Sequence, residues 1–461
     1  MKRAIAFVLA AIMTAGVLSG CGEKPEDKPE KKEITTVTVW TSQAHSKAIY
    51  DRLVEAYNNG QGKEDGVRID YQVKGGDTYQ QAIDVALQTD TAPDLFNATG
   101  LEKNVQNGYV AALDDLPGGA ELIERYKDIS GEKRNVFNGK TYTLPVSITT
   151  TGLLYNKDMF RAAGIVDEKG EPTPPETWEE VREYAKRLTN PDKREYGIVL
   201  PIKWGSAWFS YDFRNRLKSS TGYTYYDPIK DDIDCMGLVP IMEAYVGIKE
   251  DKSFFPGAEG MDNDQARALF AEGGIGMKLG VSWDAGVLND QFPAKIDWGV
   301  APDPVADKNN KYCQLGNYSY GMVINAKSVD TVGAEKIMKA YSFLHSDEVL
   351  KELYLGGVTI PSDYKIIEDV STDKLPKGWK EFAELAEISS QAPLQPPLDI
   401  SGKKNVSDAF LNEVWAGTVT AREACEAFTE VLKEGRKAYR EAHPEVDYDI
   451  YLMPDYDPKK R

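Results

Sequence analysis

The chain has 461 residues and a formal net charge of −18 at pH 7, from 73 acidic and 55 basic residues. An acidic chain of this kind repels phosphate backbones, so a nucleic-acid partner is not expected. It contains only 4 cysteines and no C-x-x-C pair, which excludes a disulfide scaffold and leaves a zinc or thiol-redox motif unsupported.

The chain begins with the three-part pattern of a secretory signal. Lys2 and Arg3 give a positive start, residues 4–17 are apolar and uncharged, and Leu-Ser-Gly-Cys ends at Cys21. The apolar run is shorter than the roughly 20 residues that a membrane-spanning helix needs. Small residues directly before a cysteine resemble the lipobox of bacterial lipoproteins, which implies removal of residues 1–20 and acylation of Cys21, with palmitate among the acyl groups. A plain signal peptide with an incidental cysteine is the alternative.

Charged residues and proline dominate the segment after Cys21, which reads GEKPEDKPEKKE. Such a composition stays extended and solvated because it offers no apolar core. We therefore expect residues 21–35 to be a flexible tether that holds a domain away from a membrane.

Beyond the tether, short β-branched runs alternate with amphipathic segments. Residues 37–41 and 67–71 have the two-residue alternation of strands, and 94–97 is a third short strand. Between them, residues 46–57 and 79–87 repeat apolar side chains at the helical period. This β-α-β-α-β order predicts an α/β lobe with a largely parallel sheet.

Later helices carry recognisable start and end signals. Thr177-Trp-Glu-Glu and Thr420-Ala-Arg-Glu are capping boxes, in which the threonine hydroxyl and the glutamate carboxylate satisfy free amides of the first turn. Another predicted helix ends near His345, where a positive charge would suit the helix dipole.

Catalytic and metal-binding motifs are missing from the sequence. The three histidines are isolated, and no HExxH, G-x-S-x-G or P-loop is present. The glycine-rich run 273–280 is predicted to be a strand with its turns, and residues 262–264 to be a helix N-cap cluster. No metal, cofactor or enzyme activity is therefore expected, although a glycosidase carboxylate pair needs no closeness in sequence. Three cysteines are predicted to be buried apolar residues, with one bridge left open: Cys235, Cys313 and Cys425.

Aromatic residues are abundant, with 8 Trp, 25 Tyr and 14 Phe. In residues 203–212 they alternate with short polar side chains, around Trp204 and Trp208. Sugars present C–H faces to flat rings and hydroxyls to polar groups, so this segment is typical of a sugar site. For each single ring, packing in the hydrophobic core is an equal alternative.

Several motifs follow one another along the chain: LP at 144–145, TTGLLYNKD at 150–158, FRAAGI at 160–165, PPETWEE at 174–180, FAEGGIGM at 270–277 and VSW at 281–283. In this order they resemble the family 1 extracellular solute-binding proteins of ABC importers, in particular the sugar-binding group that includes the maltose-binding proteins. The resemblance extends over nearly the whole chain after the tether. The sequence departs from the family pattern at Val281-Ser, where the family has glycine, and in the tail after Glu441.

The resemblance implies a two-lobed α/β fold of the periplasmic-binding-protein type (type II). Each lobe would be a mixed sheet flanked by helices, and three hinge crossings would join the lobes. The N-terminal lobe would comprise residues 36–146 and 324–372, and the C-terminal lobe residues 149–320 and 376–461. The ligand would lie between the lobes, and hinge closure would bury it.

The resemblance also implies a set of ligand-binding residues. Trp283 is similar to a family tryptophan that stacks on sugar, and Trp204 follows a strand where the family places another aromatic ring. The other expected residues come from α/β loops, the hinge and the neighbourhood of these rings: Trp208, Trp40, Ser42, Gln43, His45, Asn97, Thr99, Thr149, Thr150, Asp284 and Tyr318.

We therefore expect a monomeric lipoprotein on the extracellular face of the cell membrane, which is the periplasmic side in a Gram-negative cell. It would capture a small molecule, preferably an oligosaccharide, and deliver it to the permease subunits of an ABC transporter. A strongly anionic ligand is disfavoured, because no cluster of Arg or Lys is evident near the expected cleft. A membrane-anchored carbohydrate-active enzyme and an adhesion or signalling lipoprotein outside transport remain the alternatives.

Overall fold

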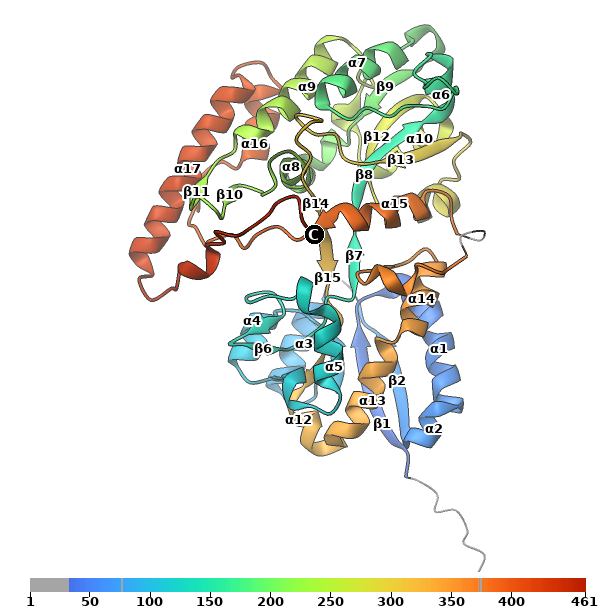
Figure 1. Cartoon of the computed structure of the whole chain (residues 1–461), viewed down its shortest axis with the longest axis vertical. Helices are drawn as coiled ribbons and strands as arrows, with labels where there is room; N and C mark the ends of the chain where they lie inside the picture. The colour runs from blue at the N-terminus through green and yellow to red at the C-terminus, as the bar shows by residue number, and fades with distance from the viewer. Residues whose placement is uncertain (1–32, 76–77, 372, 374) are drawn as a thin grey trace, which may run out of the picture.

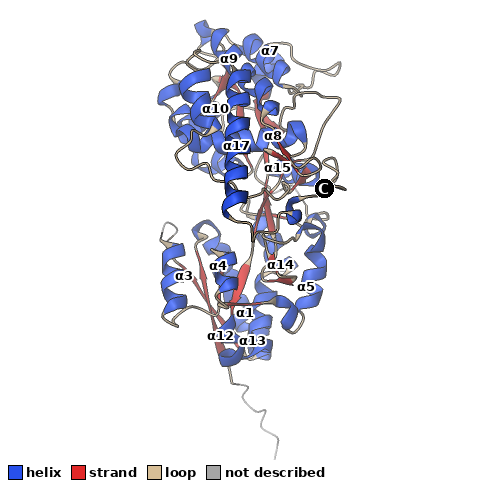
Figure 2. Cartoon of the chain, turned by 90° about the vertical axis from the view of Figure 1, so that its left-hand side faces the viewer, coloured by secondary structure: helices blue, strands red, loops and turns tan. Residues whose placement is uncertain are grey.

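The computed structural model describes residues 33–75, 78–371, 373 and 375–461, and it contains two lobes joined at a narrow waist (Figures 1 and 2). The predicted signal, Cys21 and most of the predicted tether lie outside these residues. Within the described part, no helix combines the length and the apolar character needed to cross a bilayer.

The N-terminal lobe is built on a five-stranded sheet with the order β2-β1-β3-β16-β4. The first three strands are parallel, and β16 runs antiparallel to its neighbours. Val37 and Val39 of β1 are fully buried because one face of the strand packs against helices. The strand bounds are β1 Thr35–Thr41, β2 Val67–Val73, β3 Leu95–Asn97, β4 Val110–Ala111 and β16 Met322–Asn325. The predicted β-α-β-α-β order is confirmed.

Amphipathic helices flank this sheet. In α3, Tyr79, Ile83, Ala86 and Leu87 form the buried stripe that the period predicts. The helix bounds are α1 Lys47–Asn59, α2 Gln61–Asp65, α3 Tyr79–Gln88, α4 Leu101–Gln106, α5 Gly119–Tyr126, α12 Ala326–Ser328, α13 Ala334–Leu344 and α14 Asp347–Leu355. A short hairpin, β5 Val136–Phe137 with β6 Lys140–Thr141, follows α5.

The C-terminal lobe has a four-stranded sheet with the order β13-β8-β12-β9. The glycine-rich run forms β12, as predicted. The neighbouring strand β9 requires glycine at position 197, because a Cβ there would lie 2.3 Å from Ala185 Cα of α7. The helix therefore packs directly on the backbone of the sheet. The strand bounds are β8 Thr151–Asn156, β9 Tyr196–Val199, β12 Ile275–Val281 and β13 Trp298–Ala301.

The helices of this lobe begin where the capping signals predict. Thr177 and Thr420 both form complete capping boxes, and Asp262 forms a third with Gln265, which confirms the N-cap cluster. The helix bounds are α6 Lys157–Ala162, α7 Trp178–Leu188, α8 Gly205–Thr221, α9 Val239–Glu250, α10 Asn263–Glu272, α11 Asp284–Gly286, α15 Trp379–Leu385, α16 Val406–Ala409 and α17 Ala421–Ala442. The hairpin of β10 Tyr226–Asp227 and β11 Asp232–Ile233 lies beside α17 (Figure 1).

Cys235, Cys313 and Cys425 are buried and free, so no bridge joins them. The prediction that they are small buried residues is confirmed. Burial raises the pKa of the Cys235 and Cys425 thiols to about 12, which keeps both protonated and unreactive at neutral pH.

Short strands form the waist between the lobes. β7 Ser147–Thr149 pairs antiparallel with β15 Asn317–Ser319 on one side and with β17 Ile360–Pro361 on the other. Just above them, β14 Gln314–Leu315 runs parallel to β18 Ser389–Ser390. Figure 1 shows β7 and β15 passing from one lobe to the other. Short extended segments of this kind can absorb a rotation of the lobes.

The predicted role of His345 as a cation at a helix end is wrong. The ring is buried, accepts a hydrogen bond from the Met322 amide at 3.1 Å and lies 2.7 Å from the Tyr341 carbonyl oxygen. Burial lowers the pKa of His345 to about 4. The imidazole is therefore neutral at pH 7 and joins α13 to strand β16 as a hydrogen-bonding core residue.

Acidification should therefore destabilise the protein. Between pH 6.5 and pH 4, the His345 side chain is protonated in the unfolded chain but stays neutral in the folded protein. The free energy of unfolding should therefore fall by about 3 kcal/mol by pH 4. Urea unfolding at several pH values measures this loss. In His345→Gln, the part of the pH dependence that belongs to this window should disappear. An unchanged pH profile in that variant would contradict the assignment.

Candidate functional site

The C-terminal ends of β1 and β3 form the edge of the N-terminal lobe that faces the waist. These strands are parallel neighbours, with Trp40 opposite Phe96. Asn97 is buried, and its side-chain oxygen accepts hydrogen bonds from the Thr41 hydroxyl and from the Ser42 amide at 3.1 Å. Asn97 therefore holds the first β-α loop in place.

The remaining predicted residues of this lobe lie around the same loop. Trp40 is half-buried with the Lys74 ammonium 4.4 Å from its ring centroid, and Ser42 and Gln43 are also half-buried. His45 is exposed. Thr99 is half-buried and its hydroxyl donates to Gln80 of α3. The loop thus offers an aromatic edge and polar groups to the waist.

Two exposed tryptophans mark the facing edge of the C-terminal lobe. Trp204 ends the turn that precedes α8, and Trp283 immediately precedes α11 at the end of β12. Their side chains are 49% and 52% exposed. Two large flat rings exposed to water at the carboxyl ends of neighbouring strands are suited to a ligand surface. That both rings contact ligand, as the family resemblance implies, stays a prediction.

A small recess lies beside these rings, between α8, α10 and β12. Trp208 and Tyr211 of α8 line one wall, with the Trp208 ring edge-on to Phe209 at 4.9 Å. Asn263 lines the other wall, and its buried side-chain oxygen has no hydrogen-bond partner among the residues that the structure describes. A buried acceptor without a partner is rare and suits a ligand hydroxyl. The sequence identified Asn263 only as part of an N-cap cluster.

Asp284 was expected to bind ligand, and its surroundings do not favour that role. It is 1% exposed, and its carboxylate accepts hydrogen bonds from Arg267 Nε at 2.7 Å and from the Val281 amide at 3.1 Å. Lys278 Nζ lies 3.6 Å away, and burial lowers the pKa of Lys278. With its oxygens engaged inside the protein, Asp284 holds the turn that presents Trp283.

Thr150 is a second expected ligand residue that is engaged elsewhere. It is fully buried, and its hydroxyl donates to the Phe382 carbonyl at 2.8 Å, which fixes α15 to the waist. Thr149 is half-buried in β7 opposite Asn317, and Tyr318 is half-buried in β15. The Asn317 amide donates to Asn215 at 3.1 Å and to the Tyr211 hydroxyl at 3.3 Å. The waist and α8 are thereby coupled by residues that the sequence did not single out.

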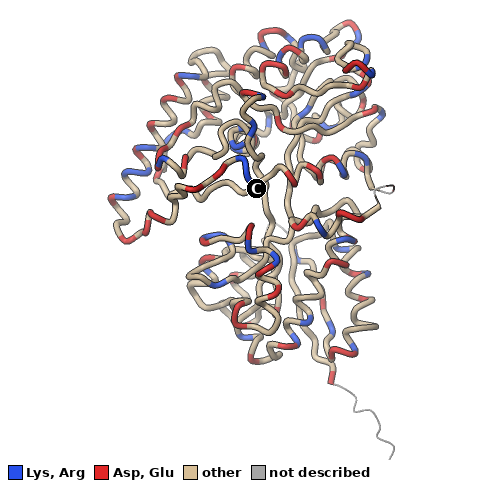
Figure 3. Tube along the Cα trace, in the orientation of Figure 1, with Lys and Arg blue, Asp and Glu red and all other residues tan. Residues whose placement is uncertain are grey.

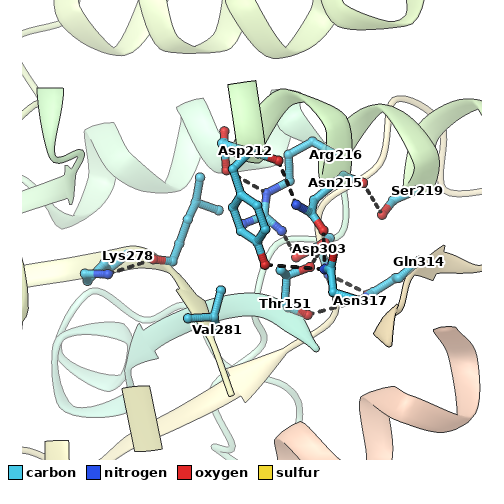
Figure 4. Close-up of polar contacts among 12 residues, drawn as sticks. Thr151, Asp212, Asn215, Arg216, Ser219, Lys278, Val281, Asp303, Gln314 and Asn317 are labelled. Carbon is cyan, nitrogen blue, oxygen red and sulfur yellow. Dashed lines mark hydrogen bonds and ion pairs between the residues drawn. The ribbon is translucent and has the colours of Figure 1, made fainter. Parts of the chain in front are cut away.

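A buried charge network borders the recess (Figure 4). Arg216 lies between two carboxylates, with Nε 3.1 Å from Asp212 and Nη1 paired with Asp303. The Tyr245 hydroxyl donates to Asp212 at 2.8 Å, and the Thr151 hydroxyl donates to Asp303 at 2.7 Å. The network joins α8 to β8 directly above the waist. Because both carboxylates are buried and paired, their geometry suits support rather than acid catalysis.

A larger cavity of about 800 Å³ lies elsewhere, between the proline-rich loop 172–176, residues 311–314 and the chain end. None of the expected ligand residues lines it. The two lobe edges with their exposed rings therefore remain the candidate ligand surface.

The comparison with protein families decides the identification. The sequence matches the bacterial extracellular solute-binding protein family over residues 41–348, which is more than half of the chain. The chain belongs to this family. The membership that the sequence motifs implied is confirmed.

Curated relatives of this solute-binding protein are distant but span most of its length. A maltooligosaccharide ABC transporter solute-binding lipoprotein of Streptococcus pneumoniae is 24% identical over 89% of this chain and 95% of its own. A maltotriose-binding protein of Pyrococcus abyssi is 25% identical over 68% of this chain and 65% of its own. A putative binding protein of Brucella abortus is 21% identical over 77% of this chain and 87% of its own.

Solved structures agree with the fold. The GacH receptor of Streptomyces glaucescens, known unliganded and in complex with acarbose, superposes with a TM-score of 0.61 at 20% identity, over 92% of this chain and 99% of that one. The maltose/maltodextrin-binding domain MalE of Bdellovibrio bacteriovorus, bound to maltotriose, gives a TM-score of 0.57 at 18% identity, over 87% and 99% of the chains. The predicted two-lobed α/β fold is confirmed.

Proposed function

We propose that this solute-binding protein captures an oligosaccharide between its lobes and delivers it to the permease subunits of an ABC transporter. The observation that carries the proposal is the pair of exposed rings, Trp204 and Trp283, at the lobe edge. Their flat faces suit sugar C–H surfaces, and the free acceptor of Asn263 suits a hydroxyl. The printed names of relatives that bind maltotriose and maltooligosaccharides support the same ligand class.

The proposed mechanism is a hinge closure. The N-terminal lobe, residues 36–146 and 324–372, would present the loop around Trp40, and the C-terminal lobe, residues 149–320 and 376–461, would present the two exposed rings. A ligand that touches both edges binds the closed form better than the open form and so shifts the population toward closure. The closed monomer would then be the form that the permease recognises.

A fluorescence titration tests the proposal. The purified chain from residue 22 onward would be titrated with a panel of oligosaccharides, and tryptophan emission would be followed. A saturable change with at least one glycan is expected, and chromatography should recover that glycan intact, since the proposal includes no catalysis. A glycan cleaved by the protein would favour the anchored-enzyme alternative, and flat curves from folded protein would contradict an oligosaccharide ligand.

We further propose that an acylated Cys21 anchors the protein to the extracellular face of the membrane, with residues 21–35 as the tether. Cells that express the protein and receive a palmitate analogue with a reporter group should label it, and Cys21→Ala should lose the label and release the protein from the membrane fraction. Substitution of Cys313, which is buried in the C-terminal lobe, is the matched control and should keep the label. A Cys21→Ala protein that stays in the membrane fraction would contradict the anchor.

A further inference from the structure

A cavity of about 590 Å³ lies in the C-terminal lobe between α8, the β10–β11 hairpin, residues 395–400, the start of α16 and α17. Most of its wall is apolar or aromatic and includes Leu398, Val406 and Phe428. None of the described residues that line it is acidic. Cavities of this size, with apolar walls and a few polar groups, are typical of sites for small organic molecules.

Contacts between separate elements hold the walls of this cavity in place. The Asp399 amide donates to the Gly435 carbonyl of α17 at 3.1 Å, and a Cβ on Gly435 would lie 2.6 Å from the Asp399 carbonyl oxygen. Arg436 of α17 donates through Nη1 to the Asp231 carbonyl of the hairpin at 2.9 Å. Helix α17 buries Phe428 against the cavity, and charges of both signs lie along the helix (Figure 3). The cavity is therefore part of the folded lobe before any ligand arrives.

Several polar groups at the cavity are left without a partner in the described part of the chain. Arg214 forms no hydrogen bond or ion pair there, and the Tyr225 hydroxyl forms no hydrogen bond. The side-chain amides of Gln395 and Asn405 each use only one of their two polar atoms. A ligand group with oxygen atoms can complete these hydrogen bonds, whereas a hydrocarbon would bury the polar atoms unpaired.

Tyr211 connects the cavity to the candidate ligand surface. It lines both the cavity and the small recess beside Trp208 and Asn263. Along α8, Trp208 precedes it at the recess and Arg214 follows it at the cavity. The recess has a volume of about 30 Å³, which admits one small polar group but no sugar ring. A ligand held at the exposed rings can therefore extend a bulkier group past Tyr211 into the cavity.

We propose that the cavity binds an aromatic acyl group with oxygen substituents, which the oligosaccharide carries as an ester. The inference rests on the proposed function and names a substituent of its ligand. Tyr225 and Phe428 meet edge to face with 6.0 Å between ring centroids, and such rings favour an aromatic group beside them. The Arg214 guanidinium can donate to the ester carbonyl or lie over the ring of the ligand. An alkyl chain would satisfy the apolar wall but not the free polar groups.

Monoesters of the same glycans test the substituent. Each glycan of the fluorescence panel would be converted to 4-hydroxycinnamoyl, octanoyl and acetyl monoesters, each as a mixture of positional isomers. The mixtures would be incubated with the protein, and mass spectrometry would identify what ultrafiltration retains. At least one 4-hydroxycinnamoyl ester should be retained about tenfold more strongly than its unmodified glycan and than its octanoyl and acetyl counterparts. Free 4-hydroxycinnamate should be retained about tenfold more weakly than that ester.

Variants assign the effect to the cavity. Leu398→Trp fills the cavity and Arg214→Gln removes the guanidinium, so each should lower retention of the preferred ester by about fivefold or more. Both should change binding of the unmodified glycan by less than about twofold. Arg422→Gln on α17, which does not line the cavity, is the matched control and should change neither. Arg214 and Arg422 are exposed, so neither glutamine variant should unfold the protein.

The outcomes separate this inference from the proposed function. Equal retention of the 4-hydroxycinnamoyl esters and the unmodified glycans, or an ester preference that survives both Leu398→Trp and Arg214→Gln, would overturn the acyl site while an oligosaccharide ligand stands. Octanoyl esters retained equally well would overturn the aromatic group, and free 4-hydroxycinnamate retained as strongly as its ester would overturn the link to the glycan. If folded protein retains neither esters nor unmodified glycans, both proposals fail together.

Discussion

Alanine in place of either Trp204 or Trp283 should weaken binding of the preferred oligosaccharide about thirtyfold, and the double variant should show no measurable binding. Each ring is about half exposed in the free protein, so its removal takes away stacking area without opening a cavity in the core. A central aromatic contact typically contributes about 2 kcal/mol to binding, which corresponds to the thirtyfold loss. Calorimetric titration of the three variants measures it.

Conservative and remote substitutions complete this experiment. Trp283→Phe and Trp204→Phe keep a flat ring and should recover part of the affinity. Ile229→Ala removes a side chain that is 47% exposed outside the candidate surface, and it should leave binding unchanged. Wild-type affinity in both single alanine variants would show that the exposed rings do not touch the ligand.

Most of the fold was predictable because its signals are local. The stripe of Tyr79, Ile83 and Leu87 repeats at the helical period, and the capping boxes at Thr177 and Thr420 place helix starts to the residue. These patterns depend on neighbours within one or two turns. The order of strands in each sheet is not a local property, and the family resemblance implied a mixed sheet in each lobe without an order of strands.

The site was only partly predictable, because burial decides what a polar side chain does. Asp284 and Thr150 have suitable chemistry and suitable positions in the chain, yet packing turns both inward toward Arg267 and Phe382. His345 has the sequence position of a helix-end cation, but packing against β16 keeps it neutral. Such outcomes depend on tertiary contacts that single-sequence patterns do not encode.

Contacts between residues far apart in the chain were missed for the same reason. Asn317 of β15 and Asn215 of α8 are 102 positions apart in the chain, and only the tertiary fold brings their side chains within hydrogen-bond distance. Trp283 and Trp204 could be named from the sequence, because Trp283 follows a recognisable motif and Trp204 lies in an aromatic segment, and their contact with ligand stays a prediction.

Removal of the Arg216 guanidinium should lower the free energy of unfolding more than any other single substitution proposed for this protein. In Arg216→Ala, Asp212 and Asp303 would stay buried beside the recess without a cation, and breaking a buried ion network in this way typically costs about 3–5 kcal/mol. Urea unfolding at pH 7 measures the loss. Arg182→Ala, which removes an ion pair with Asp251 at the surface, is the matched control and should cost less than about 1 kcal/mol.

The pH dependence of the variant separates charge from lost packing. Burial already raises the pKa of Asp212 in the native protein, and without the positive charge of Arg216 this carboxyl should keep its proton to still higher pH. A folded state that binds more protons than the unfolded state loses stability as the pH rises, so Arg216→Ala should be least destabilised near pH 5. Adding Asp212→Asn and Asp303→Asn should recover part of the loss at pH 7, because no buried charge then remains unpaired. If Arg216→Ala lowers the free energy of unfolding by the same amount at every pH, and the two asparagine substitutions do not restore it, Arg216 stabilises α8 by packing alone.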